Sequence, residues 1–315
     1  MNKSLHLVAE EYRPVADFIP AFKVSDETVG MLRETMDKMS EPFLIKVEIE
    51  PEVVKVNEHT TIYLSKPQNK MPDGEKLPVI YFTHGGGLIS GSALSFLGLN
   101  QKKADKYNAI YATVEYRLAP ENPFPAAIED VAAGLKWIYD NADEFSIDKN
   151  RISTYGESAG GGLTAALSFY VRDKFPEINI KNQILIYPML DYQTSVDPEN
   201  FPNKYIGEFV WTHDLNIYGW KSYQGKQAIA QDELAYFSPA HATDFSSLPK
   251  TYISFGSLDL FFEEDLKFIQ DLSRAGNEIS ARIVNGAIHG FDSFPNSPIA
   301  DEYNRELDAY IKDVL

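Results

Sequence analysis

Cysteine is absent from this 315-residue sequence, and long apolar runs are absent too. Without cysteine the chain has no disulfide, no thiolate-ligated zinc or iron–sulfur centre and no thiol nucleophile. No stretch approaches the roughly 18 consecutive apolar residues that a membrane-spanning helix requires. Glu10, Glu11 and Asp17 interrupt the segment in which a secretory signal needs an unbroken apolar core. We therefore expect a cytoplasmic protein without a signal peptide and without a membrane partner.

Basic residues are also scarce, because 29 Lys and Arg stand against 46 Asp and Glu, for a formal net charge of −17. Binding to nucleic acid is driven by clustered Lys and Arg, so this acidic balance argues against a nucleic-acid partner. Apolar residues are plentiful, since 44% of the chain is hydrophobic and 13% is aromatic. This composition excludes wholesale disorder, and the length predicts one large domain or a domain that carries a subdomain.

Short strand-like runs alternate with helical patterns from residue 43 onward. Runs of β-branched or aromatic residues predict strands at 43–56, 60–64, 79–83, 109–114, 151–155, 183–187, 251–255 and 279–284. Apolar residues at helical spacing predict helices at 128–138, 159–172, 263–275 and 299–314. This alternation is typical of an α/β protein in which helices cover both faces of a mostly parallel sheet.

Two segments, 1–40 and 192–247, do not follow the alternation. The first is helical in pattern, and its predicted apolar side consists of Met31, Leu32, Thr35, Met36 and Met39. The second has eleven aromatic residues among 56, which is too many for a solvated linker. We expect it to form a folded cap over the carboxyl edge of the sheet, where ligands of open α/β sheets bind. The alternative is a satellite core that contributes only stability.

Residues 156–160 read Gly-Glu-Ser-Ala-Gly, between a predicted strand and a predicted helix. A serine hydroxyl is a weak nucleophile unless a sharp turn holds it exposed beside a base, and such a turn needs small flanking residues. Ser158 is therefore the candidate nucleophile. A glycine-rich turn that only packs helix on strand is the structural alternative.

Residues 84–87 read His-Gly-Gly-Gly, directly after the predicted strand 79–83. Glycines let backbone N–H groups approach a developing oxyanion. A phosphate-binding loop is the rival interpretation, but no Lys-Ser/Thr follows and the G-x-G-x-x-G spacing is missing.

A serine hydrolase of this kind needs an acid and then a histidine after the nucleophile. His241 lies in the aromatic-rich segment with no strand before it, whereas His289 lies just past the last predicted strand, so His289 is the better base. Asp259 follows the strand 251–255 and is the candidate acid. A glycosidase pair or a metal site would not explain Ser158 and the glycine loop, so we predict no metal.

Several motifs occur together in one order along the chain. They are 84–87 (His-Gly-Gly-Gly), 116–121 (Tyr-Arg-Leu-Ala-Pro-Glu), 124–127 (Phe-Pro-Ala-Ala) with Asp130, 156–161 (Gly-Glu-Ser-Ala-Gly-Gly), Asp259 and 289–291 (His-Gly-Phe). With this set the chain resembles the hormone-sensitive-lipase-like family of α/β-hydrolase carboxylesterases, which are acetyl-esterase-like, over residues 40–315. It departs from the common pattern at two positions, because Glu157 stands where Asp is usual and Leu260 where Pro is usual.

The resemblance implies an α/β-hydrolase fold with an eight-stranded, mostly parallel sheet, flanking helices and a two-part helical cap. Residues 41–191 and 248–315 would form the catalytic domain, and residues 1–40 and 192–247 the cap. It also implies hydrolysis of short-chain acyl esters by a serine carboxylesterase without a cofactor.

In such an enzyme each candidate residue has a role. Ser158 would attack the ester, His289 would move the proton and Asp259 would hold the imidazole. The N–H groups of Ala159 and, carried over from the family loop, of Gly85 and Gly86 would form the oxyanion hole.

We expect a small-molecule ester to bind beneath the cap, against apolar side chains whose dispersion contacts are insensitive to acyl identity. The predicted lining residues are Met36, Phe209, Trp211 and Trp220. An amidase or peptidase on the same site stays open, and so does a non-catalytic ligand-binding homologue. The resemblance further suggests a homodimer through the edge strand 279–284, which would otherwise expose unpaired backbone groups.

Overall fold

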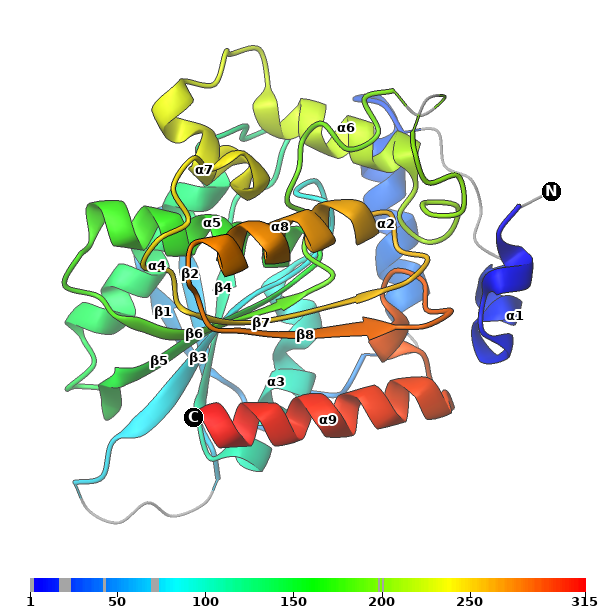
Figure 1. The fold of residues 1–315 in the computed structure, drawn as a ribbon. Coiled ribbons are helices and arrows are strands. Elements are labelled where there is room, and N and C mark those ends of the chain that lie inside the picture. Colours follow the sequence, from blue (N-terminus) through cyan, green and yellow to red (C-terminus); the bar gives the residue numbers. More distant parts are fainter. Residues whose placement is uncertain (1–2, 17–23, 42–43, 69–73, 198, 200) are drawn as a thin grey trace.

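The structure is a computed structural model that describes residues 3–16, 24–41, 44–68, 74–197, 199 and 201–315. Its centre is an eight-stranded sheet with the order β1-β2-β4-β3-β5-β6-β7-β8 (Figure 1). The strands are β1 (Glu52–Lys55), β2 (Thr61–Ser65), β3 (Leu77–Thr83), β4 (Ile110–Glu115), β5 (Ile147–Glu157), β6 (Ile180–Ile186), β7 (Lys250–Gly256) and β8 (Ile279–Val284). Only the pairs β1–β2 and β2–β4 are antiparallel. The predicted α/β-hydrolase fold is therefore confirmed.

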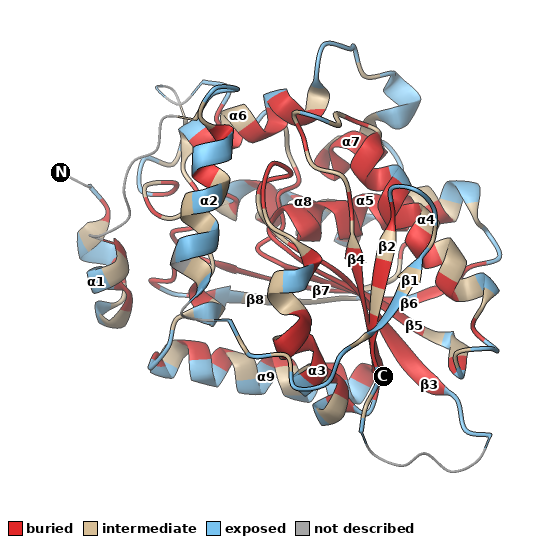
Figure 2. Ribbon diagram, turned by 180° about the vertical axis from the view of Figure 1, so that it is seen from behind, coloured by how far each residue is buried: buried red, intermediate tan, exposed pale blue. Residues whose placement is uncertain are grey.

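Helices cover both faces of this sheet. On one face lie α3 (Leu97–Tyr107) and α9 (Pro298–Val314), and on the other α4 (Ala126–Asp140), α5 (Ala159–Lys174) and α8 (Phe262–Arg274) (Figure 1). All seven residues of β3 are buried, as expected for a strand covered on both sides. Figure 2 shows the same burial along the central strands and on the inward sides of the helices.

The packing of α9 follows from its sequence pattern. Its buried residues recur at helical spacing and are Ala300, Tyr303, Leu307, Ile311 and Val314. Ser297 begins the helix, since its side chain accepts a hydrogen bond from the Ala300 N–H. Such an apolar stripe fixes which side of the helix faces the sheet.

The remaining helices belong to the N-terminal segment and to the insertion between β6 and β7. They are α1 (Arg13–Ala16), α2 (Val29–Ser40), α6 (His213–Gln224) and α7 (Leu234–Phe237). Short 3₁₀ turns occur at Leu5–Leu7, Glu10–Tyr12, Ala93–Phe96, Gln231–Glu233, Pro239–His241 and Phe291–Ser293. The described helices include none with the length and apolar character needed to cross a membrane.

The N-terminal segment and the insertion lie against each other. Glu208 accepts a hydrogen bond from the Ser4 N–H at 2.8 Å, and the Tyr218 hydroxyl donates to Asp26 at 3.0 Å. In Figure 1 both segments lie above or beside the carboxyl edge of the sheet, with α2 next to α6.

The predicted apolar side of residues 31–39 is partly wrong. Leu32 is buried, but Met31 is 66% exposed and lies on the solvent side of α2. Adjacent positions of a helix point about 100° apart, so Met31 and Leu32 do not face the same neighbour. The Met39 side chain is outside the described part of the chain.

The first predicted strand is also wrong over most of its length. Residues 44–51 form no strand, and pairing begins at Glu52. Residues 42 and 43 lie outside the described part. The segment crosses α3 instead, because a Cβ added to Gly98 would lie 1.9 Å from the Ile45 carbonyl oxygen. Close packing on a helix, rather than pairing with a strand, positions these residues.

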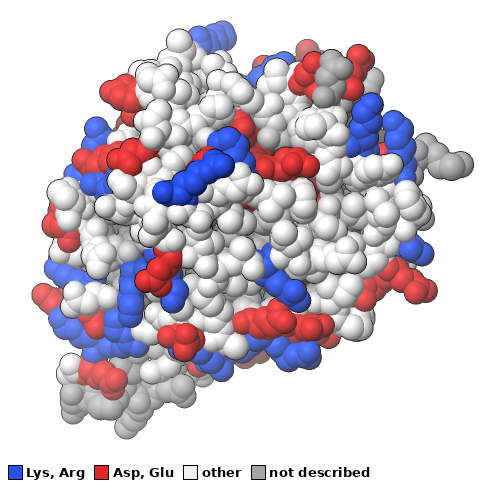
Figure 3. Space-filling model, viewed as in Figure 1, with Lys and Arg blue, Asp and Glu red and all other residues white. Residues whose placement is uncertain are grey.

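Charged side chains of both signs are interspersed on the face of the molecule shown in Figure 3. Lys and Arg form no continuous basic surface on this face.

Candidate active site

Ser158 lies at the sharp turn between β5 and α5, with φ of 56° and ψ of −122°. A non-glycine residue with this backbone conformation is strained and is held in place by its surroundings. The flanking glycines make the turn feasible. A Cβ on Gly156 would lie 2.1 Å from the Gly160 carbonyl oxygen, and a Cβ on Gly160 would lie 2.1 Å from that of Thr83.

Three predicted residues come together at the carboxyl edge of the sheet. His289 Nε2 lies 2.9 Å from Ser158 Oγ, and His289 Nδ1 lies 2.8 Å from Asp259 Oδ2. A carboxylate only accepts hydrogen bonds, so the imidazole donates from Nδ1 and its Nε2 is free to accept the serine proton. The second oxygen of Asp259 accepts from the Phe261 N–H at 3.0 Å, which fixes the carboxylate.

Aromatic rings hold the imidazole from two sides. The Tyr187 ring lies 4.7 Å from the His289 ring, and the Phe261 ring 5.3 Å from it, both edge to face. All three catalytic candidates are at least 90% buried. Burial in an apolar surrounding strengthens the hydrogen bonds between them.

The glycine loop packs directly on the serine. A Cβ on Gly85 would lie 3.2 Å from Ser158 Cβ, which is a tight contact, so a glycine favours this close approach of the loop. The Gly86 carbonyl accepts from the Ser90 N–H and hydroxyl, at 3.0 and 2.8 Å, which closes the turn. Ala159 is the first residue of α5, so its N–H has no acceptor within the helix.

His84 has a structural place in this loop. It is fully buried, its ring stacks on Tyr116 at 4.3 Å, and the Tyr116 hydroxyl donates to the His84 carbonyl at 2.9 Å. Burial lowers the pKa of His84 to about 4, so the ring is neutral at ordinary pH. Its ring therefore supports the fold of the loop.

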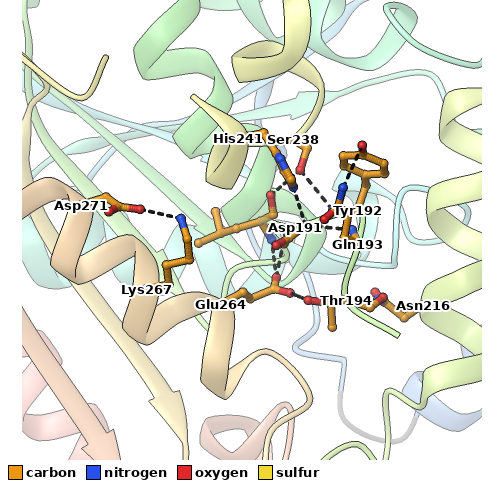
Figure 4. Close-up of polar contacts among 11 residues, drawn as sticks. Asp191, Tyr192, Gln193, Thr194, Asn216, Ser238, His241, Glu264, Lys267 and Asp271 are labelled. Atoms are coloured by element: carbon orange, nitrogen blue, oxygen red, sulfur yellow. Dashed lines mark hydrogen bonds and ion pairs between the residues drawn. The ribbon is translucent and has the colours of Figure 1, made fainter. Parts of the chain in front are cut away.

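The other histidine that was considered as a base belongs to a different cluster (Figure 4). His241 Nε2 lies 2.7 Å from Asp191 Oδ1. Ser238 Oγ donates to the Leu190 carbonyl at 2.7 Å and accepts from the Tyr192 N–H at 3.1 Å. These bonds join the beginning of the insertion to its end.

Glu264 of α8 completes this cluster, and the sequence did not indicate this role. Its carboxylate accepts from the Leu190 and Asp191 N–H groups, at 2.6 and 3.2 Å, and from the Thr194 hydroxyl. Burial, followed by the charge of Asp191, raises the pKa of Glu264 well above its usual range. The residue therefore anchors the base of the insertion to the catalytic half of the fold.

Arg33 of α2 is a second residue that the sequence did not reveal. Its guanidinium donates to the Ile89 and Ala119 carbonyls at 2.6 and 2.9 Å, and pairs with Glu121 at 2.8 Å. Ile89 lies two residues after Gly87, the last residue of the glycine loop, so Arg33 ties the N-terminal segment to the end of that loop.

The predicted substrate-binding residues reach different places. Met36 Sδ lies 3.4 Å from Ser90 Oγ, and Trp211 lies so close to the glycine loop that a Cβ on Gly87 would be 1.9 Å from its ring. Trp220 lines a small cavity beside Ala159. Phe209 is buried in the hydrophobic core.

Comparison with known proteins identifies the fold family. A family model described as alpha/beta hydrolase fold matches residues 79–293. The chain belongs to this family. It falls in the hormone-sensitive-lipase-like branch of carboxylesterases.

Among the described residues no group of three or more His, Asp or Glu could hold a metal ion.

Individual relatives of the α/β-hydrolase chain include enzymes and a receptor. An arylesterase of Saccharolobus solfataricus is 30% identical over 240 residues, or 75% of this chain and 74% of that protein. The gibberellin receptor GID1C of Arabidopsis thaliana is 30% identical over 249 residues, which cover 76% of this chain and 70% of the receptor. The structure of a bacterial heroin esterase matches with a TM-score of 0.86 and 26% identity, over 99% of each chain.

Proposed function

We propose that this α/β-hydrolase is a serine carboxylesterase that hydrolyses short-chain acyl esters. That it is a carboxylic ester hydrolase follows from its family and from relatives named esterases. The proposal concerns which residues carry out catalysis and how large an acyl group the enzyme accepts. It depends above all on the unbroken contact from Ser158 through His289 to Asp259 at a strained turn.

In the first half-reaction, Ser158 Oγ attacks the ester carbonyl while His289 Nε2 takes the hydroxyl proton. The imidazolium that forms is stabilised by Asp259 and then gives its proton to the leaving alcohol. An acyl group remains on the serine oxygen. In the second half-reaction, His289 takes a proton from water while the water oxygen attacks the acyl carbon, and the imidazolium then gives this proton to Ser158 Oγ as the bond to the acyl carbon breaks, which releases the carboxylic acid and the free serine.

Negative charge develops on the carbonyl oxygen in both steps. The N–H groups of Gly85, Gly86 and Ala159 would donate to this oxyanion. The loss of one such donor typically costs about 3 kcal/mol of transition-state stabilisation. The close packing of Gly85 on Ser158 supports this role.

The preference for short acyl groups is supported by the cavity beside Ala159. It has a volume of about 10 Å³, which is room for about one water molecule. Its walls are apolar and include Leu88, Met189, Trp220 and Tyr223. Only the end of a short, uncharged acyl group fits such a space without rearrangement of its walls.

We also propose that residues 1–40 and 192–247 act as the cap, and residues 41–191 and 248–315 as the catalytic domain. The contacts Ser4–Glu208 and Asp26–Tyr218 support one cap made from both segments. Met36 and Trp211, one from each segment, approach the glycine loop and would close the site from above.

A homodimer through β8 remains a proposal, which light scattering on the purified protein would test.

Substitution of each histidine gives a matched test of the mechanism. His289→Asn and His241→Asn each remove one imidazole that pairs with an aspartate, but only the first contacts Ser158. We expect Ser158→Ala and His289→Asn to lower kcat for p-nitrophenyl butyrate by about 10⁴-fold or more, and His241→Asn to change it little. Full turnover by Ser158→Ala would refute the mechanism.

The two alternative functions, a non-catalytic binding protein and an amidase, are tested by separate experiments. The similarity to a gibberellin receptor keeps a non-catalytic binding protein as a second candidate. A fluorophosphonate probe that labels wild type but not Ser158→Ala would exclude it. Matched ester and amide substrates would separate an esterase from an amidase.

A further inference from the structure

Three aromatic side chains form a buried stack between the catalytic half and the insertion. The rings of Tyr223 and Phe237 stack at 5.4 Å with an interplanar angle of 11°. Phe124 meets both rings edge to face, at 5.7 Å from Tyr223 and 5.4 Å from Phe237. All three side chains are almost completely buried.

The stack separates two empty spaces. On one side is the small cavity beside Ala159, and Tyr223 and Phe237 form part of its wall. On the other side is a surface groove of about 250 Å³, whose wall includes Phe124, Tyr170 and Tyr236. Tyr236 and Phe237 are neighbours in α7, so the two spaces adjoin the same short helix from its two sides.

Helix α5 leads from one space to the other. Ala159, Leu163 and Ala166 line the cavity, and Tyr170 and Lys174 line the groove. Residues three to four positions apart share one side of a helix, so these five residues form a single stripe that begins next to Ser158. At 1.5 Å per residue the stripe is about 22 Å long. Figure 1 shows α4 and α7 lying beside α5 along this path.

We propose that the stack of Phe124, Tyr223 and Phe237 is a partition that ends the acyl pocket and sets the longest acyl chain the enzyme accepts. This inference rests on the proposed esterase function. The groove beyond the partition is the space into which the distal carbons of a longer acyl chain would extend if the partition were opened.

The groove has an apolar floor beneath a charged rim. Phe124, Ile128 and Tyr236 are buried and apolar along its floor. Charges lie at its exposed rim, where Lys174 is accompanied by Glu129, Asp232 and Glu233. An alkyl chain on the floor would gain dispersion and hydrophobic contact and would leave the rim charges in water.

Chain-length profiles of partition variants test this inference. Phe237→Ala removes a ring that contacts both other members of the stack, and Phe124→Leu shortens the ring on the groove side while keeping most of its apolar volume. The substrates are p-nitrophenyl acetate, butyrate, hexanoate, octanoate and decanoate. Each methylene that becomes buried is expected to raise relative kcat/KM by about fourfold, so burial of two of the four extra methylenes of octanoate should raise the octanoate-to-butyrate ratio by roughly tenfold or more.

Phe245→Ala is the matched control. Phe245 is also buried against two phenylalanines, at 5.5 Å from Phe169 and 5.4 Å from Phe268, but it lines neither space. It should lower thermal stability without changing the chain-length profile. Phe237→Leu serves in place of Phe237→Ala if the alanine variant does not melt cooperatively.

The outcomes separate this inference from the proposed function. A wild-type protein that hydrolyses none of these esters would refute the function itself. A wild type active on acetate, together with folded and active partition variants whose profile matches wild type, would overturn the partition. A profile that shifts equally in Phe245→Ala would overturn it as well, because general loosening would then explain the change.

Discussion

Lys103 Nζ lies 3.9 Å from Glu157 Oε1, and both side chains are largely buried, with exposures of 17% and 11%. Lys103 belongs to α3 and also lies over the Tyr155 ring at 4.7 Å. Glu157 immediately precedes the proposed nucleophile. Burial raises the pKa of Glu157 to about 7, Lys103 opposes this rise, and the nearby Asp292 charge adds to it. Glu157 therefore titrates near neutral pH beside the catalytic turn.

Glu157→Gln should change how stability depends on pH. Because the folded-state pKa of Glu157 is raised, its contribution to stability is fully present below the unfolded-state pKa of about 4.3 and is lost as the pH rises through about 7. The variant lacks this loss, so its Tm relative to wild type should be higher at about pH 8 than at about pH 5. Thermal melts at both pH values, with the exposed Glu34→Gln as control, test this. A difference in Tm between variant and wild type that is the same at both pH values would contradict the prediction.

Asp292→Asn should move the acidic limb of the pH–rate profile. The Tyr187 hydroxyl donates to Asp292 at 2.8 Å, and the Tyr187 ring contacts His289. Burial raises the pKa of Asp292, and the Asp292 carboxylate interacts with the charge of His289, so its removal makes the protonated form of the catalytic base less favourable and should extend kcat/KM to lower pH. Profiles with p-nitrophenyl acetate measure the shift.

Tyr187→Phe separates the hydrogen bond from the charge in this prediction. It removes the hydroxyl but keeps the Asp292 carboxylate, so the limb should move less than in Asp292→Asn. An unchanged limb in Asp292→Asn would show that this charge does not reach His289. The exposed Asp301→Asn is the control for a general change in net charge.

Asp265→Asn should stabilise the protein above neutral pH. Asp265 is fully buried, and neither of its carboxyl oxygens has a hydrogen-bond partner among the described residues. Burial, then the charges of Glu264 and Asp259, raises its pKa well above the usual range. Its contribution to stability is therefore present in acid and lost as the pH rises. We expect a gain in Tm of about 2 °C or more at about pH 8 and less at about pH 5, whereas the exposed Asp313→Asn should show neither.

Arg33→Met should reduce activity more than stability. The substitution removes the donors to the Ile89 and Ala119 carbonyls and so loosens the glycine loop. We expect kcat/KM for p-nitrophenyl acetate to fall roughly tenfold, which corresponds to about 1.4 kcal/mol. Glu121→Gln is the control, because it removes only the half-exposed ion pair, worth at most about 1 kcal/mol. Equal losses in both variants would contradict the role of the carbonyl contacts.

Elements with a regular apolar pattern could be predicted from the sequence. The strand Ile279–Val284 was predicted with its observed bounds, and the predicted helix 299–314 differs from α9 by one residue at its start. Helix α3 was not predicted, because its inward side includes Asn100 and Gln101 as well as apolar residues. Asn100 is buried and its side-chain amide donates to Thr113 Oγ1 at 2.9 Å, and such a pairing between residues of different elements leaves no local signal.

In the candidate site, too, some residues could be predicted from the sequence and others could not. Ser158 and the glycine loop could be predicted because tight turns permit few residue types, and that restriction is local. The choice of His289 over His241 was a prediction from strand position. Glu264 and Arg33 were missed because their partners, backbone groups at Leu190 and Ile89, are far away in the sequence.

The sequence by itself determined the alternation of strands and helices, the strained turn at Ser158 and the absence of thiol chemistry, because each depends on local composition and spacing. Only the tertiary structure decided that His241 pairs with Asp191, that Met31 faces solvent, and that an aromatic stack closes the space beside Ala159. These features depend on which distant residues meet when the apolar faces pack together. Packing energy arises from contacts between segments, so the sequence of one segment alone does not predict it.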